Sequence, residues 1–167
     1  KELDGNKAVG IDKVTKDEYG KNLDRNIKDL VQRLKNKSFK PLPSLRVYIP
    51  KANGKKRPLG IASYEDKIVQ MAVKKILGAI YEPRFLNCMY GFRPNRSCHE
   101  AIKEVYQRIS YGKISYIVDA DIKGFFDHID HEWMIKFLEW NIQDKNLLWL
   151  IRKYLKAGIM EQGKFEP

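Results

Sequence analysis

The sequence feature that most constrains the fold is a long amphipathic pattern between positions 64 and 81. Apolar side chains recur there at the three- and four-residue steps of one helix face: Ile68, Val69, Ala72, Val73, Ile76, Leu77 and Ile80. Ser63 is a candidate N-cap, and Glu82-Pro83 ends the pattern. A helix with so wide an apolar face needs other elements to cover it, so the pattern predicts the core helix of the protein.

Two further helices are predicted from their N-terminal capping signals. Thr15-Lys16-Asp17-Glu18 has the capping-box pattern, and the apolar steps that follow it predict a helix over residues 16–36. Ser97 and Glu100 form a second capping box, which predicts a helix that ends near Tyr111. Each helix would place one apolar stripe against the rest of the protein.

The last third of the chain is also mainly helical by pattern. Helices are predicted over residues 130–140, with Asp130 as the cap, and over residues 145–156, where Gly158 ends the second one. Residues 161–167 contain no evident turn or cap. We therefore expect the chain to be a part of a larger fold.

A β-hairpin is predicted between the first and the core helix. Residues 45–50 alternate as a strand does, Asn53-Gly54 supplies a turn that accepts positive φ, and residues 56–61 would return antiparallel. Pro50 and Pro58 cannot donate ladder hydrogen bonds, so the strands should end there or have an exposed edge. The turn between them would carry a basic tip.

The charge of the chain is strongly uneven. The 32 Lys and Arg residues exceed the 21 Asp and Glu residues, for a net charge of +11 at pH 7. Residues 31–60 contain no acidic side chain and nine basic ones: Arg33, Lys35, Lys37, Lys40, Arg46, Lys51, Lys55, Lys56 and Arg57. A plain solvated face is the alternative, but crowded like charges favour a polyanionic partner such as nucleic acid or a nucleotide phosphate.

Composition excludes several classes of protein. With 43% hydrophobic residues, 7 Pro and 11 Gly, the chain is neither disordered nor collagen-like. It has no apolar run of the roughly 18 residues that cross a bilayer and no signal-peptide pattern, so we expect no membrane partner and a soluble, cytoplasmic protein. Cys88 and Cys98 have no zinc-like spacing, and we expect buried or free thiols.

The residues with the clearest chemical content follow an apolar run. Residues 114–118 are apolar on both faces, which predicts a buried strand that ends in Asp119-Ala-Asp121. A carboxylate on a rigid buried element suits Mg²⁺, although an Asp-x-Asp pair alone is more often part of a turn or a solvated strand edge. Gly124 would let backbone amides approach a ligand, and Phe125-Phe126 would form an apolar wall, unless one ring or both belong to the core.

Four motifs in order resemble one family, the reverse transcriptases encoded by group II introns. They are Gly10-Ile11-Asp12, Tyr48-Ile-Pro-Lys51 with Arg57-Pro-Leu-Gly-Ile61, Tyr90-Gly-Phe-Arg-Pro-Asn-Arg-Ser97, and Asp119-Ala-Asp-Ile-Lys-Gly-Phe-Phe-Asp127. Retron and diversity-generating reverse transcriptases share the last motif, whereas the first and third favour the group II intron type. The match covers nearly the whole chain.

The resemblance implies an α+β fold and a division into two subdomains. Residues 1–112 would form helix-rich fingers that include an N-terminal extension and the basic hairpin. Residues 113–167 would form the first strand and helices of a truncated palm. The implied activity is RNA-directed DNA polymerisation, with binding of intron RNA in splicing and mobility.

The family's functional residues carry over to matching positions. Asp121 would be the first catalytic aspartate, and it would bind Mg²⁺ together with the carbonyl of Ile122, whereas Asp119 would not be a ligand. Lys51 and Arg57 would hold the triphosphate of the incoming nucleotide. The backbone of Gly124 and Phe125 would face it, and Phe126 would exclude ribose. Intron RNA would bind the basic residues Lys35, Lys37, Lys40, Arg46, Lys55 and Lys56.

The implied partners are group II intron RNA, an RNA template with a DNA primer, and deoxynucleoside triphosphates, and we also expect a homodimer. However, the family's Tyr-x-Asp-Asp and Pro-Gln-Gly motifs do not occur in these 167 residues. We therefore expect the chain to be inactive alone. The alternatives are a non-catalytic RNA-binding module and, much less favoured, a metal-dependent glycosyltransferase that uses Asp119 and Asp121.

Other candidates have plainer interpretations. His99, His128 and His131 lack ligand spacing, so capping or packing is favoured. Trp133, Trp140 and Trp149 have helical spacing that is typical of core or subunit contacts. Arg93 and Arg96 could contact a template strand or could stabilise their loop through ion pairs, and the sequence favours neither.

Overall fold

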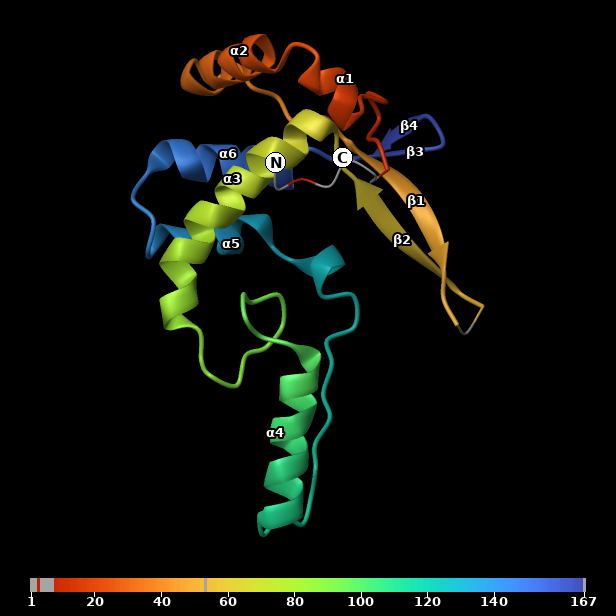
Figure 1. Cartoon of the computed structure of the whole chain (residues 1–167), viewed down its shortest axis with the longest axis vertical. Coiled ribbons are helices and arrows are strands. Elements are labelled where there is room, and N and C mark those ends of the chain that lie inside the picture. The colour runs from red at the N-terminus through yellow and green to blue at the C-terminus, as the bar shows by residue number, and fades with distance from the viewer. Residues whose placement is uncertain (1–2, 4–7, 53, 167) are drawn as a thin grey trace. The chain divides into compact units, whose positions relative to one another are not determined.

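The computed structural model describes residues 3, 8–52 and 54–166 (Figure 1). Its helices are α1 (Lys16–Gly20), α2 (Leu23–Lys35), α3 (Tyr64–Tyr81), α4 (Cys98–Tyr111), α5 (His131–Glu139) and α6 (Lys145–Leu155), with short 3₁₀ turns η1 (Glu82–Arg84) and η2 (Phe126–His128). Its strands are β1 (Ser44–Pro50), β2 (Lys56–Ile61), β3 (Ile159–Glu161) and β4 (Lys164–Glu166). The predicted α+β class is confirmed. No helix among the described residues is long and apolar enough to cross a bilayer.

The chain forms two compact units, and each is described here by itself. One unit contains Lys1–Lys74 and His131–Pro167, and the other contains Lys75–Asp130. The division falls within α3. The predicted boundary between fingers and palm at residues 112 and 113 concerns a different property, the functional subdomains, and stays a prediction.

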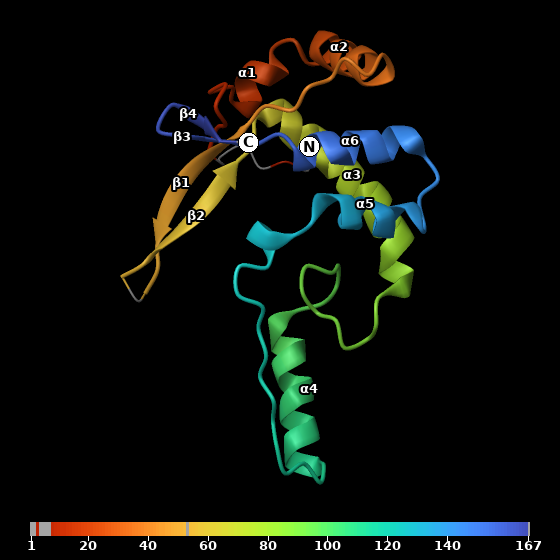
Figure 2. The same ribbon diagram turned by 180° about the vertical axis from the view of Figure 1, so that it is seen from behind.

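The first unit contains a four-stranded sheet in the order β2-β1-β3-β4. β1 pairs antiparallel with β2 and parallel with β3, and β3 pairs antiparallel with β4. The short β3–β4 hairpin lies beside the start of β1, and the β1–β2 hairpin projects beyond it (Figure 1 and Figure 2). The predicted β1–β2 hairpin is thus confirmed, and Pro58 lies on the edge strand, where its missing N–H leaves no ladder bond unmade.

The turn of this hairpin is longer than the two-residue turn that the sequence suggests. The Lys51 N–H donates to the Lys55 carbonyl at 2.7 Å, and the Gly54 N–H donates to the Lys51 carbonyl at 3.0 Å. Gly54 has φ of +75°, as expected for a loop of this type. The other half of the predicted turn, Asn53, lies outside the described residues.

The predicted caps at Thr15, Ser63 and Ser97 are confirmed, the cap at Asp130 stays a prediction, and the predicted core helix spans residues 64–81 as expected. Both capping boxes form, at Thr15 and at Ser97. The Ser63 hydroxyl oxygen accepts a hydrogen bond from the Asp66 N–H at 3.1 Å, which caps α3. The predicted helix over residues 16–36 is instead two helices, because Gly20 is a poor helix former and Asn22 adopts a non-helical conformation with φ of −126° and ψ of 42°.

Two predictions for extended segments are wrong. Residues 161–167 do contain a turn: Gln162 and Gly163 both have positive φ and join β3 to β4, but glutamine is not among the residues that signal such a turn. Residues 114–118 are not a strand and are exposed, with Val118 at 89%. A strand needs hydrogen-bonding neighbours, and the sheet formed by the described residues does not include this segment.

The core of the first unit lies between α2, α3 and α6. Its buried centre is Leu30, Phe39 and Val69, and the partly buried residues packed against it are Leu34, Ile68, Val73, Trp149, Leu150 and Tyr154. The expected core role is therefore confirmed for Trp149. Trp133 in α5 and Trp140 after it are exposed, so core packing is wrong for these two, and their alternative role in subunit contacts stays a prediction.

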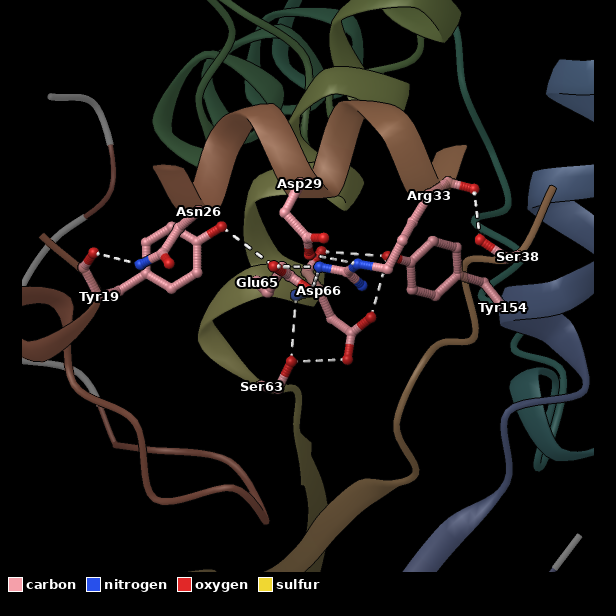
Figure 3. A network of polar contacts seen from close by, with 9 residues as sticks. All are labelled: Tyr19, Asn26, Asp29, Arg33, Ser38, Ser63, Glu65, Asp66 and Tyr154. Atoms are coloured by element: carbon pink, nitrogen blue, oxygen red, sulfur yellow. Dashed lines mark hydrogen bonds and ion pairs between the residues drawn. The ribbon is translucent and has the colours of Figure 1, made fainter. Parts of the chain in front are cut away.

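A buried carboxylate connects the start of α3 to two distant segments. The Asp66 side chain is 2% exposed and accepts hydrogen bonds from the Ser63 hydroxyl at 2.7 Å and the Tyr154 hydroxyl at 3.1 Å (Figure 3). It also accepts one from the Leu42 N–H at 3.1 Å. Burial raises the pKa of Asp66, and these three donors oppose that shift. Asp66 thus joins α3, the segment before β1 and α6.

A second polar cluster joins the first three helices. Arg33 Nη2 lies 2.8 Å from both carboxylate oxygens of Glu65, and Arg33 Nε lies 2.7 Å from Asp29 Oδ2 (Figure 3). The Tyr19 hydroxyl donates to Glu65 at 3.1 Å, and burial followed by the Glu65 charge raises the pKa of Tyr19. Glu65 therefore connects α1 and α2 to α3.

Replacing Asp66 tests the importance of this buried carboxylate. We expect Asp66→Ala to lower the free energy of unfolding by about 3 kcal/mol, because it leaves buried donors without an acceptor. Urea denaturation followed by circular dichroism measures this change. The control Asp29→Ala removes an exposed helical ion pair and should cost less than about 0.5 kcal/mol; equal losses in the two variants would contradict the prediction.

Candidate functional site

The tip of the β1–β2 hairpin brings three basic residues to one face. Arg57 pairs with Ile49, and the Lys51 N–H continues the ladder by donating to the Lys55 carbonyl. Directly opposed residues share a face and side chains alternate along each strand, so Lys51, Lys55 and Arg57 lie on the same face. All three are exposed. This arrangement can hold one polyanionic group between the two strands.

The opposite face of the hairpin has a different character. Arg46 and Tyr48 lie there, and both contact Glu161 of β3. Arg46 Nη1 is 3.7 Å from Glu161 Oε2, and the Tyr48 hydroxyl donates to Glu161 Oε1 at 2.5 Å. This hydrogen bond raises the pKa of Tyr48. Sequence reasoning missed Glu161, because no local pattern connects it to residues more than 100 positions earlier.

The remaining basic candidates lie on or near α2 and at the hairpin turn. Lys35 is the last residue of α2, and Lys37 and Lys40 follow it. All three are exposed, and so is Lys56 beside the turn. The first unit thus carries exposed basic residues on two separate elements, at the end of α2 and at the hairpin tip. Their predicted role in RNA binding stays a prediction.

The Asp121 loop lies in the second unit. Asp121 and Ile122 are exposed, and Gly124 has φ of +63° in a turn that the Asp127 N–H closes on the Gly124 carbonyl at 3.1 Å. An added Cβ at Gly124 would lie 3.0 Å from the His128 ring, so any other residue would have to shift this ring and would be strained at the positive φ.

The two phenylalanines of this loop are not core residues. Phe125 is 50% exposed and Phe126 is 82% exposed. Their rings pack edge to face, with 5.4 Å between the ring centroids. The interpretation in which one ring is buried is therefore wrong, because at least half of each side chain is exposed. An exposed aromatic pair beside a carboxylate leaves a surface that a nucleotide sugar could contact.

The donor atoms for a metal ion are incomplete in the described residues. No three side chains of His, Cys, Asp or Glu come together there as a metal site would require. Asp121 offers one carboxylate and Ile122 one carbonyl, which are suitable oxygen ligands but do not by themselves make a site for two cations. Asp121 belongs to one unit and Lys51 and Arg57 to the other, so their convergence stays a prediction.

The structure decides between the two interpretations of Arg93. Its side chain is 9% exposed, and it donates to Glu82 at 2.9 Å and to the carbonyls of Leu86 and Met89 at 2.8 and 2.9 Å. Its guanidinium also stacks over Phe85. Arg93 therefore stabilises its own loop. Arg96 is less constrained and lies over the Tyr90 ring.

Comparison with known proteins gives a consistent result. The profile of a family described as reverse transcriptase (RNA-dependent DNA polymerase) matches residues 49–166. Group II intron-encoded protein LtrA of Lactococcus lactis is 44% identical over 143 residues, which are 85% of this chain and 24% of LtrA. Protein YkfC of Escherichia coli is 37% identical over 164 residues, which are 96% of this chain and 43% of YkfC.

An uncharacterized 91 kDa protein in a cob intron of Schizosaccharomyces pombe is 39% identical over 140 residues, which are 84% of this chain and 17% of that protein. The chain thus spans less than half the length of each of these relatives. The matched region includes the basic hairpin tip and the Asp121 loop. The resemblance inferred from the motifs is confirmed.

Replacing Arg93 tests its role in the loop. We expect Arg93→Ala to raise amide hydrogen exchange of residues 85–96 about tenfold, because the two carbonyls and Glu82 lose their donor. Exchange measured by mass spectrometry checks this. The control is Arg108→Ala, which removes an exposed ion pair with Glu104. Unchanged exchange at residues 85–96 in the Arg93 variant would refute the assignment.

Proposed function

The chain belongs to the reverse transcriptase family, and from this premise we propose that it forms part of a group II intron-encoded RNA-directed DNA polymerase. Residues 1–112 would be the fingers and residues 113–167 the first part of the palm. The observation that carries the proposal is the family match over residues 49–166, which includes both candidate site regions. The names of LtrA and of the cob intron protein support the intron type.

The proposed reaction adds a deoxynucleotide to a DNA primer on an RNA template. The 3′-hydroxyl of the primer attacks the α-phosphate of a deoxynucleoside triphosphate, and pyrophosphate leaves. Lys51 and Arg57 would bind the triphosphate, which is supported by their position on one hairpin face. Charge complementarity alone brings this substrate to the hairpin tip.

The Asp121 loop would bind the sugar and the divalent cation. Asp121 and the Ile122 carbonyl would be ligands of a cation, for which we propose Mg²⁺ because both donors are hard oxygens. When bound, such a cation supplies charge stabilisation for phosphoryl transfer. The Gly124–Phe125 backbone would face the triphosphate, and the exposed Phe126 ring would contact the sugar where a 2′-hydroxyl would clash.

A bacterial cytoplasmic location and self-association complete the proposal. LtrA and YkfC are proteins of bacteria, which supports the location. α4 has exposed apolar side chains at Ile102, Val105 and Tyr106. Surface of this kind supports a homodimer, since apolar patches favour association.

Primer extension tests the polymerase assignment. We expect Asp121→Asn, made in a longer protein that also carries a Tyr-x-Asp-Asp motif, to reduce incorporation by at least about 10³-fold while RNA affinity stays within about twofold, because a metal ligand is lost and no phosphate contact is. Asp119→Asn is the matched control and should extend primers. The 167-residue chain alone should give no template-dependent product; product from it, or normal extension by Asp121→Asn, would reject the assignment.

The proposed RNA-binding role has its own test, because the exposed basic residues favour RNA binding even without catalysis. We expect the triple change of Lys35, Lys37 and Lys40 to alanine to weaken RNA binding and to reduce the slope of log affinity against log salt by about 2–3, because each lost phosphate contact removes about 0.7–0.9. Filter binding at several salt concentrations measures the slope. Alanine at Lys145, Lys153 and Lys156 matches the charge change; if that control flattens the slope equally, the binding surface lies elsewhere.

A further inference from the structure

Glu161 is the side chain that connects the β3–β4 hairpin to the projecting β1–β2 hairpin. It is the last residue of β3, and both its carboxylate oxygens face β1. One oxygen accepts from the Tyr48 hydroxyl at 2.5 Å, and the other lies 3.7 Å from Arg46 Nη1. Two separate side chains of β1 are therefore held by one carboxylate.

The backbone attachment between these hairpins is short. β1 and β3 pair only at Ser44 with Ile159 and at Leu45 with Met160, and the Ser44 N–H donates to the Gly158 carbonyl at 3.1 Å. The contact between Tyr48 and Glu161 lies three residues farther along β1 than the last of these pairs. The carboxylate therefore extends the attachment toward the tip, where the described hairpin continues as two strands.

A two-stranded ribbon needs such an attachment to hold one direction. Paired strands twist strongly when nothing else packs on them, and an isolated hairpin is only marginally stable in water. The tip that carries Lys51 and Arg57 follows directly after this ribbon. A small change in the angle at Tyr48 would therefore move both cations.

Glu161 holds the hairpin without neutralising the tip. Arg46 and Tyr48 lie on the face opposite to Lys51, Lys55 and Arg57, because the two groups occupy alternate positions. The Glu161 side chain is 22% exposed and the Arg46 side chain 31%, so the interaction is partly shielded from water. Hydrogen bonds to an ionised group are stronger than neutral ones, which suits a structural attachment.

We propose that Glu161 is a positioning residue that fixes the direction of the β1–β2 hairpin and thereby the place of Lys51 and Arg57 at the nucleotide triphosphate. The positional half of this proposal stands on the contacts of Glu161. The nucleotide half rests on the proposed function. The two halves can be tested separately.

Distance measurements on the 167-residue chain test the positional half. Cys88 and Cys98 are replaced by serine, and spin labels are attached to Ala52→Cys at the tip and Lys28→Cys in α2. We expect Glu161→Ala to broaden the distance distribution about twofold, because β1 loses both contacts, and Glu161→Gln to broaden it less, because its amide oxygen can still accept from the Tyr48 hydroxyl. Circular dichroism shows whether each variant keeps its helices.

Two further variants make the result decisive. Tyr48→Phe removes one hydroxyl and no charge, so it tests the attachment even if the Glu161 variants lose their fold, and it should also broaden the distribution. Glu166→Gln makes the same charge change on β4 and should leave the width unchanged. A distribution in Glu161→Ala or Tyr48→Phe as narrow as in the Glu166 control would overturn the proposal.

Steady-state kinetics test the nucleotide half in a longer protein that polymerises. We expect Glu161→Ala to raise the KM for deoxynucleoside triphosphate about fivefold and to change kcat by less than about twofold, because Lys51 and Arg57 are displaced while the reacting groups are not. A broadened distance distribution with an unchanged KM would support the positioning role and overturn the assignment of the hairpin tip to the triphosphate.

Discussion

The buried carboxylate of Asp66 is the interaction on which the first unit depends. It caps its own helix with Ser63, and it also accepts from the Leu42 backbone and the Tyr154 hydroxyl. Because Leu42 lies two residues before β1, this contact determines where the hairpin leaves the core. A carboxylate that is 2% exposed needs these donors, so its surroundings can adopt few other arrangements. The buried Asp66 carboxylate thus helps to position the hairpin that carries the basic tip.

The charge distribution of the hairpin follows the alternation of its strands. Lys51, Lys55 and Arg57 share one face, and the acid that meets the opposite face, Glu161, comes from β3. The basic residues of this segment repel one another, because the segment contains no acidic residue. In the fold, Glu161 partly compensates this positive charge on the opposite face of the hairpin, and the tip remains cationic. An anionic ligand would complete the compensation on the exposed face. This division would suit the proposed binding of a nucleoside triphosphate at the tip.

The Asp121 loop shows a different relation between structure and chemistry. Gly124 and His128 shape a tight turn, but Asp121 and Phe126 stay exposed, and the apolar segment before them is not part of the described sheet. The proposed polymerase chemistry needs more carboxylates than these residues bring together. Family membership therefore rests on the motifs and relatives, whereas the geometry of the hairpin supports only the proposal that its tip binds an anion.

The sequence by itself determined the local structure: both capping boxes, the core helix from Tyr64 to Tyr81 and the hairpin with Gly54 in its turn depend on neighbouring residues. Sequence motifs also identified the family. Only the tertiary structure decided that Arg93 stabilises its own loop, that residues 114–118 are not a strand, and that Glu161 accepts a hydrogen bond from Tyr48. These outcomes depend on whether a distant partner is present, and hydrogen bonds across 88 or 113 positions leave no periodic pattern in the chain.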